Sequence, residues 1–381
     1  YENKKETIPL IQTTAGLEYM ISTKIKTLID IDKKTIGLMN LDKNSEIKTD
    51  NLRAQLNQHY NFRIIDPTAN IPESIDVLLI SAATDTVDTS TINNIRKYLG
   101  SGKKVFLAQS GVNADIKTQQ ANPLFSNIFD LLKDFRLDLQ KNLVLDAKCG
   151  NVQVQEQRGI FLMNRPVQYP LFPTIDTFNG SDSLSGIVVN DLEQVLLLFP
   201  SEIKIDSIQN ENVNSISTLF TSSNNSGIME SNLVLSPDPQ QNPFIRMLGQ
   251  PAKLLAATSR LNNGGELMLV SDSRFLTDEG GMSIPVNMIF MMNAVDYLAN
   301  DADLIALRSR EITSRPLDIL QLSDEEEKSM SQDDKDKLKN SKKKRWKFAN
   351  MVLPTLLIMG FGFYRIRREK IQAEVLKQIY D

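Results

Sequence analysis

The sequence predicts an α/β fold: an open, mainly parallel, Rossmann-like sheet with helices on both faces, a β-rich middle segment and a C-terminal transmembrane helix. Three observations support this prediction. Short, almost continuously apolar runs alternate with helical patterns over residues 35–108, as in parallel sheets covered by helices. Residues 142–250 contain short extended pieces separated by turn signals. Residues 348–364 carry no charge and lie between clusters of lysine and arginine.

The first elements follow helix and strand periodicity in turn. Apolar side chains recur at roughly helical spacing in residues 1–34, which predicts an N-terminal helical segment. Strands are expected at residues 35–39, 62–65, 76–81 and 104–108, and helices at 51–60 and 91–99. We expect Asp50 to be the N-cap of the helix at 51–60, because its carboxylate can accept hydrogen bonds from the first helical amides.

The second part of the domain is expected to contain fewer regular elements. Helical spacing predicts a helix at residues 123–135, whereas the polar, turn-rich residues 206–250 are expected to form loops. A hairpin is expected between residues 253–258 and 266–271, because the sequence NNGG between them forms turns readily. The helix expected at residues 285–300 is apolar all round, so its methionines should lie in the core.

Polar residues directly follow several of the expected strands. In an open parallel sheet, ligands bind beyond the carboxyl ends of the strands. A ligand-binding or docking edge is therefore predicted at Asp42, Ser81, Ser110, Asp272, Ser273 and Arg274. The same residue types also cap helices and turns, so a purely structural role is the alternative interpretation.

The sequence contains no motif for nucleotide or nucleophilic chemistry. It lacks G-x-x-x-x-G-K-[ST], G-x-G-x-x-G and G-x-S-x-G, so we expect neither ATP hydrolysis nor a nucleophile elbow. The one cysteine, Cys149, is away from any strand–helix turn, and the one histidine, His59, is expected on a surface helix. No catalytic residue, cofactor or metal site is therefore predicted. The net charge of −4 and the lack of a broad basic face argue against a nucleic-acid partner.

The carboxyl-terminal part predicts a membrane anchor. Residues 322–345 are almost entirely polar and are expected to form a solvated, charged spacer. Residues 346–366 are expected to span the bilayer as a helix, and residues 367–381 to form a cytoplasmic tail. Close helix packing is expected at Pro354, Gly360 and Gly362. A buried core helix is the alternative interpretation of the apolar run.

Three segments near the carboxyl terminus carry a family resemblance. They are AKLLAATSRLNNGGELMLVSDSRFLTDE (252–279), NMIFMMNAVDYLANDADLIALRSREITSRPL (287–317) and RWKFANMVLPTLLIMGFGFYRIRREK (345–370). In this order they resemble the gliding-motility-associated GldG family, whose members are auxiliary components of ABC-type export systems in Bacteroidetes-like bacteria. Weaker similarity extends upstream to residues 9–28.

The resemblance implies a non-enzymatic membrane component with an extracytoplasmic α/β domain at residues 35–321, related to amidotransferase-like sheets and to a domain of an intraflagellar-transport protein. It also implies association with a separate ABC permease and a separate ATPase, in gliding motility or protein secretion. The large domain would lie in the periplasm of a bacterium, anchored in the inner membrane, with a further transmembrane helix upstream of Tyr1. Counting basic residues favours the opposite orientation, because nine lie between residues 328 and 347 and five after Tyr364.

Two other functions are compatible with the sequence. The chain could be a tethered receptor for a small ligand at the carboxyl edge of the sheet. It could also be a degenerate amidotransferase-like or hydrolase-like enzyme, which the missing nucleophile elbow and the single histidine argue against.

Overall fold

The structure, a computed structural model, describes residues 33–42, 46–158, 161–178, 188–189, 192–207, 210–238, 242 and 244–300, with a few isolated positions outside these ranges. The chain divides into two compact units, Tyr1–Glu311 and Ile312–Asp381. In the second unit the described residues are Met359, Phe361, Gly362 and residues 364–368, all of which are helical. The predicted N-terminal segment, spacer and cytoplasmic tail therefore lie largely outside the described residues.

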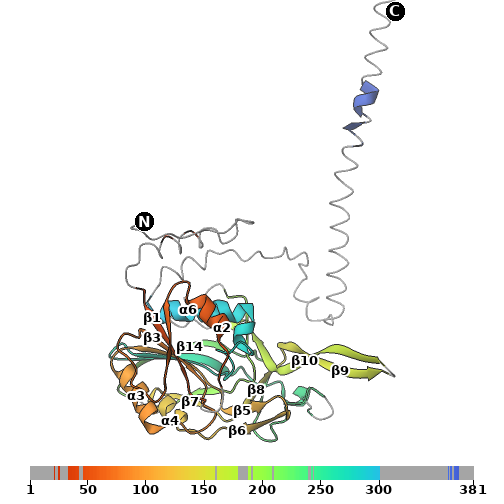
Figure 1. Cartoon of the computed structure of the whole chain (residues 1–381). Coiled ribbons are helices and arrows are strands. Elements are labelled where there is room, and N and C mark those ends of the chain that lie inside the picture. The colour runs from red at the N-terminus through yellow and green to blue at the C-terminus, as the bar shows by residue number, and fades with distance from the viewer. Residues whose placement is uncertain are drawn as a thin grey trace, which may run out of the picture. The chain divides into compact units, whose positions relative to one another are not determined.

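A large mixed sheet organises the first unit (Figure 1). Five parallel strands lie side by side in the order β17 (Glu266–Val270), β4 (Lys104–Ala108), β3 (Val77–Ser81), β1 (Thr35–Asn40) and β2 (Asn61–Ile65). Asn40 pairs with Ser81, and Ala108 pairs with Val270, so neighbouring strands end in register. The loops that follow these strands consequently meet at one edge of the sheet.

The rest of the sheet is antiparallel, so the expectation of a mainly parallel sheet was wrong. The strands are β16 (Leu254–Leu261), β14 (Val213–Thr221) and β11 (Thr177–Phe178), with β13 (Ile203–Ile205) and β7 (Leu137–Leu139) attached beside β16. The predicted hairpin is confirmed as β16–β17, and its tight turn reverses the strand direction at this point. Strand β14 was missed within the expected loops, because the apolar side chains of its sequence VNSISTLFT do not alternate regularly with its polar ones.

Helices cover both faces of the sheet, as predicted (Figure 1). Helices α2 (Asp50–Leu56) and α6 (Pro285–Leu298) pack on one face, and α3 (Thr89–Gly100) and α4 (Ile128–Asp134) on the other. Strand β3 is therefore buried on both of its faces: Leu79 packs in one core, and its neighbours Leu78 and Ile80 pack in the other. Burial on both sides explains why these parallel strands are almost continuously apolar.

Several helix boundaries differ from the prediction, most clearly those of α2 and α4. Asp50 is the first residue of α2, not its N-cap, and the acceptor comes from a distant loop. The Asp278 carboxylate accepts hydrogen bonds from the backbone amides of Asp50 at 2.7 Å and Asn51 at 3.1 Å. Helix α4 begins only at Ile128, five residues later than predicted, because Pro123 belongs to β6 (Gln120–Pro123), which pairs with β5 (Val112–Asp115), and residues 124–127 connect the two elements.

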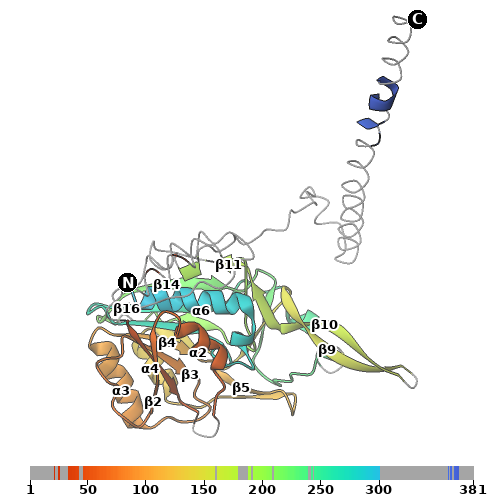
Figure 2. The same ribbon diagram turned by 45° about the horizontal axis from the view of Figure 1, so that its top comes forward.

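The middle of the chain is β-rich, as expected, and projects a long ribbon. Strands β9 (Cys149–Arg158) and β10 (Phe161–Ile175) pair antiparallel and extend away from the sheet (Figure 2). The shorter strands are β8 (Leu143–Asp146), β12 (Val195–Leu196) and β15 (Ser226–Met229). A third core joins this region, where the Tyr169 ring meets those of Phe199 and Phe244 edge-on at centroid distances of 6.2 and 5.7 Å.

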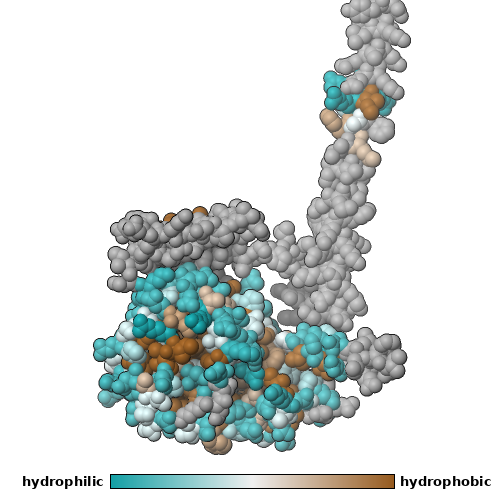
Figure 3. All heavy atoms as spheres, in the orientation of Figure 1, coloured by the Kyte–Doolittle hydropathy of each residue, from teal (hydrophilic) through white to brown (hydrophobic). Residues whose placement is uncertain are grey.

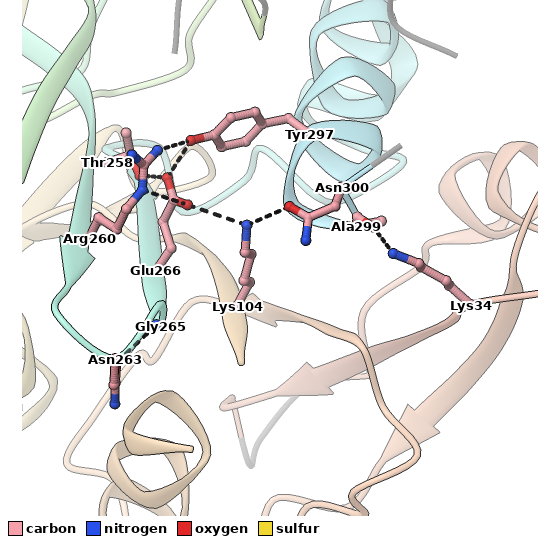
Figure 4. A network of polar contacts seen from close by, with 10 residues as sticks. All are labelled: Lys34, Lys104, Thr258, Arg260, Asn263, Gly265, Glu266, Tyr297, Ala299 and Asn300. Carbon is pink, nitrogen blue, oxygen red and sulfur yellow. Dashed lines mark hydrogen bonds and ion pairs between the residues drawn. The ribbon is translucent and has the colours of Figure 1, made fainter. Parts of the chain in front are cut away.

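A buried ionic network occupies the edge of the sheet where the parallel strands begin (Figure 4). The fully buried Glu266 carboxylate accepts hydrogen bonds from the hydroxyls of Thr258 at 2.7 Å and Tyr297 at 2.8 Å. Lys104 Nζ and Arg260 Nε lie 3.6 and 3.5 Å from its other oxygen. Burial lowers the pKa of Lys104, which Glu266 partly offsets. Because Tyr297 belongs to α6, the network holds the end of this helix against the sheet.

Helix α6 packs into the core, but it is not buried on all sides as predicted. Met291 is fully buried and Met292 almost so, whereas Met288 is half-buried and Ile289 is 44% exposed. The residues of the predicted transmembrane span are mostly outside the described part, including Pro354 and Gly360, whereas Gly362 is helical. Among the described residues, no helix has the length and apolar character needed to cross a membrane.

Candidate functional site

A polar cavity of about 590 Å³ lies where the parallel strands end. The loops after β1, β3, β4 and β17 supply its walls, and residues from the segment after β12 complete it. Five of the six residues predicted for this edge line the cavity, namely Asp42, Ser81, Ser110, Ser273 and Arg274. The structure thus brings together side chains that are up to 232 positions apart, from residue 42 to residue 274.

Hydrogen bonds between neighbouring loops shape the floor of the cavity. The Ser110 amide donates to Ser273 Oγ at 2.8 Å, and the two hydroxyl oxygens lie 3.0 Å apart. The buried Gln109 side chain accepts from the Ala83 amide at 2.8 Å and donates to the Ala83 carbonyl at 3.2 Å. These bonds tie the ends of β3, β4 and β17 together, so part of the polar character at this edge is structural.

Asp272 was predicted at the cavity and instead lies beneath it, fully buried. Its carboxylate accepts hydrogen bonds from the Leu198 amide at 2.8 Å and the Arg274 amide at 2.7 Å. Burial raises the pKa of Asp272 to about 7, and these two hydrogen bonds only partly oppose the rise. Asp272 therefore positions the loop after β17 and does not face a ligand.

Charged groups of both signs line the cavity. Lys48 and Glu279 form an ion pair of 3.1 Å at the rim, where both side chains are more than 70% exposed (72% and 73%). Deeper in, Asp42 Oδ1 accepts a hydrogen bond from Thr84 Oγ1 at 3.0 Å. Arg274 is half-buried, and its Nη2 donates to the Ala114 carbonyl at 3.1 Å.

Sequence reasoning missed several residues of this site. Lys48 and Glu279 lie on loops several positions beyond the ends of β1 and β17, where the strand-end rule no longer points to them. Leu198 and Phe199 form an apolar wall but come from the middle segment, so no local pattern connects them with the sheet edge.

The two side chains best suited to nucleophilic or base chemistry lie outside this cavity. Cys149 is the first residue of β9, and burial raises the pKa of its thiol. His59 lies in the turn that follows α2, not on the helix as predicted. Among the described residues, no three or more His, Cys, Asp or Glu side chains are grouped so as to hold a metal ion.

Residues 33–294 match the model of a family described as an ABC-type uncharacterized transport system. The chain belongs to this family. The match covers most of the chain, and it confirms the expected relation to ABC-type transport. The narrower resemblance to the GldG family stays a prediction.

Other comparisons find distant relatives. The chain is 21% identical over 393 residues to an uncharacterized protein of Borreliella burgdorferi, covering 97% of this chain and 72% of the relative. Among solved structures, it is similar to the mmIFT52 N-terminal domain, with 11% identity, a TM-score of 0.45, and coverage of 69% of this chain and 96% of that domain. A ThuA-like protein from Bacteroides uniformis matches at 10% identity with a TM-score of 0.36, covering 71% of this chain and 93% of that protein.

Proposed function

We propose that the chain is a non-catalytic, membrane-anchored auxiliary component of an ABC-type transport system. Family membership over residues 33–294 is the observation that carries this proposal. Since the sequence lacks a phosphate-binding loop, a separate ATPase must supply ATP hydrolysis, and a separate permease the transport path. We place the α/β domain in the periplasm of a bacterium, with residues 346–366 in the inner membrane and gliding motility or protein secretion as the process served.

Several observations support the parts of this proposal. The uncharged run at residues 348–364 with basic flanks favours a membrane anchor. The face of the α/β domain in Figure 3 is mostly hydrophilic, as expected of a domain exposed to water. The cavity lining contains no cysteine or histidine, which favours a binding or docking role over nucleophilic catalysis.

The β9–β10 ribbon is the part of the domain best suited to dock on a partner (Figure 2). On one face Asn151, Gln153 and Gln155 are exposed, as are their cross-strand partners Asn164 and Gln168. A two-stranded ribbon buries little apolar surface on its own, so it is only marginally stable without further contacts. An amide-rich face can form hydrogen bonds with a partner chain without the cost of burying charge.

Co-purification tests the proposal. The full chain, expressed with the permease and ATPase of its own transport system and extracted in mild detergent, is expected to carry both subunits through affinity purification. The double variant Gln153→Arg/Gln155→Arg should lose most of both subunits, whereas Gln55→Arg/Gln58→Arg, which changes two exposed glutamines near α2, should not. Recovery of the wild-type chain alone at full yield would contradict the proposed assembly. Equal recovery with both double variants would contradict docking through the ribbon.

A tethered small-ligand receptor is the second candidate function. The observation that favours it is the cavity of about 590 Å³ at the strand ends, a size and position typical of ligand sites in open sheets. Receptor and transport roles are compatible, because a transport auxiliary can bind a ligand that the system moves or senses.

A further inference from the structure

We propose that Arg274 binds the anionic group of a small ligand in the strand-edge cavity, with the hydroxyls of Ser81 and Ser273 as further donors. The inference deepens the second candidate function and does not depend on association with a permease or an ATPase. It rests on the contacts of Arg274, on the other charges of the cavity, and on the arrangement of the hydroxyl groups.

Few of the described residues use the donors of the Arg274 guanidinium. The group offers five N–H donors, and the hydrogen bond that the structure shows is the one from Nη2 to the Ala114 carbonyl. Among the described residues, no carboxylate lies within ion-pair distance of it. A half-buried arginine without a counter-ion is costly, because its charge is partly removed from water without being neutralised.

The acidic side chains of the cavity are occupied with other partners. Asp42 accepts a hydrogen bond from Thr84, and Glu279 forms an ion pair with Lys48 at the rim. Glu46 also interacts with another group. Asp272 is close in sequence and Arg274 acts on it electrostatically, lowering its pKa, but no ion pair joins the two side chains, because the two Asp272 oxygens accept backbone amides. Among the described residues no carboxylate forms an ion pair with Arg274, so its remaining N–H donors can bind a further anionic group.

Hydroxyl groups lie beside the arginine along the same edge. Ser81 is the last residue of β3, Ser110 and Ser273 follow the adjacent strands β4 and β17, and all three line the cavity. Ser110 Oγ donates to the Val112 carbonyl at 2.9 Å, so Ser273 is the donor in the 3.0 Å contact between the two hydroxyls, and its proton would turn from Ser110 to a bound ligand oxygen. No hydrogen bond of the Ser81 hydroxyl is seen among the described residues. A planar guanidinium beside hydroxyl donors suits the oxygens of a carboxylate or a phosphate group.

The rest of the cavity suits the body of a small organic anion. Its volume of about 590 Å³ lies in the range of small-molecule sites. Val112, Leu198 and Phe199 supply apolar surface on which the uncharged part of a ligand can pack. The alternative is that Arg274 only anchors the β5 backbone through Ala114, in which case the cavity would show no preference for anions.

Calorimetry on the detergent-solubilised full chain distinguishes these possibilities. Inorganic phosphate and succinate serve as probes, each measured against sodium chloride at equal ionic strength. We expect one of the two to bind the wild-type chain, which also tells phosphate ligands from carboxylate ligands. Arg274→Gln should weaken this binding by about 10-fold or more, because a charge-assisted hydrogen bond is lost. Arg63→Gln, the same change at an exposed position on β2, should leave it unaltered.

Three outcomes would overturn the proposal: no binding of either anion beyond chloride, equal binding by the Arg274→Gln and wild-type chains, or equal weakening by Arg274→Gln and Arg63→Gln. Ser81→Ala keeps the test usable if Arg274→Gln fails to fold. It removes only a hydroxyl, and we expect a loss of affinity of about 3-fold or more. Unchanged affinity in that variant would also count against the site. Co-purification with the permease is measured separately, so failure of one proposal is distinguishable from failure of the other.

Discussion

At the scale of single residues, Asp272 shows that a buried polar side chain can have a structural role where the sequence predicted a ligand-binding one. Its carboxylate is fully buried and accepts two backbone amides, from Leu198 and Arg274. Burial nevertheless raises its pKa to about 7, above the ordinary value of 3.8. The residue holds the loop that presents Ser273 and Arg274, and it couples the stability of this loop to pH.

The pH dependence of unfolding should report this group. Because the pKa of Asp272 is raised in the folded state, the folded chain binds more protons than the unfolded chain between about pH 4 and pH 7. Its contribution to stability is therefore complete below about pH 4 and is lost as the pH rises to 7. In urea titrations over this pH range, the free energy of unfolding should depend less on pH for Asp272→Asn than for the wild type. The two slopes should differ by up to about 1 kcal/mol per pH unit. Asp130→Asn, at an exposed aspartate, is the control; parallel curves for wild type and Asp272→Asn would contradict the assignment.

At the scale of elements, the end of β4 depends on a close backbone approach. The Gly111 amide donates to Ser201 Oγ at 2.8 Å, while the chain at Gln140 passes directly over its Cα. A Cβ atom at residue 111 would lie 1.8 Å from the Gln140 carbonyl oxygen, which is backbone and cannot rotate away. This contact fixes the loop after β4 against the loop after β7, and hence the position of Ser110 in the cavity.

Substitution of this glycine should be costly. Gly111→Ala is expected to lower the free energy of unfolding by about 2–3 kcal/mol, because the Gln140 backbone must shift to make room. Gly100→Ala, at the end of α3, is the matched control, since its Cβ would meet no atom within 4 Å. Thermal and urea unfolding of both variants measure the difference. Similar midpoints for the two would show that the close approach at Gly111 is not rigid.

At the scale of the whole molecule, the family relation joins an α/β domain to a transport system. The domain presents a cavity at one edge of its sheet and a projecting ribbon, and the edge where the parallel strands begin is closed by the buried Glu266 network. The proposed ligand site and the proposed docking ribbon therefore use different parts of the domain. The uncharged run of residues 348–364 belongs to the carboxyl-terminal unit and is tested separately.

Sedimentation of lysed cells tests the anchor. We expect the full chain to pellet with membranes at high speed and to require detergent for release, because residues 348–364 are uncharged. Residues 1–345 expressed by themselves should stay in the supernatant. A chain that ends at residue 368 keeps the apolar run and should still pellet, which excludes an effect of the tail. Full-length protein in the supernatant without detergent would contradict membrane anchoring.

The sequence by itself determined the elements whose signal is local. Strands β1, β3 and β4 are short apolar runs, the β16–β17 hairpin has its NNGG turn, and α6 is apolar on all sides, so each was predicted close to its observed bounds. The carboxyl ends of parallel strands lie at a common edge, and this rule alone placed Asp42, Ser81, Ser110, Ser273 and Arg274 together.

Only the tertiary structure decided the features that depend on distant partners. The antiparallel half of the sheet includes β14, whose serines and threonines carry no strong strand signal and are held by β16 and β11. Asp278 caps a helix 228 residues earlier in the chain, and Asp272 turns away from the cavity to bind the Leu198 amide. Sequence periodicity indicates which side chains are buried. It does not indicate which distant backbone group will form a hydrogen bond with a buried polar atom, because that partner is determined by the packing of the whole domain.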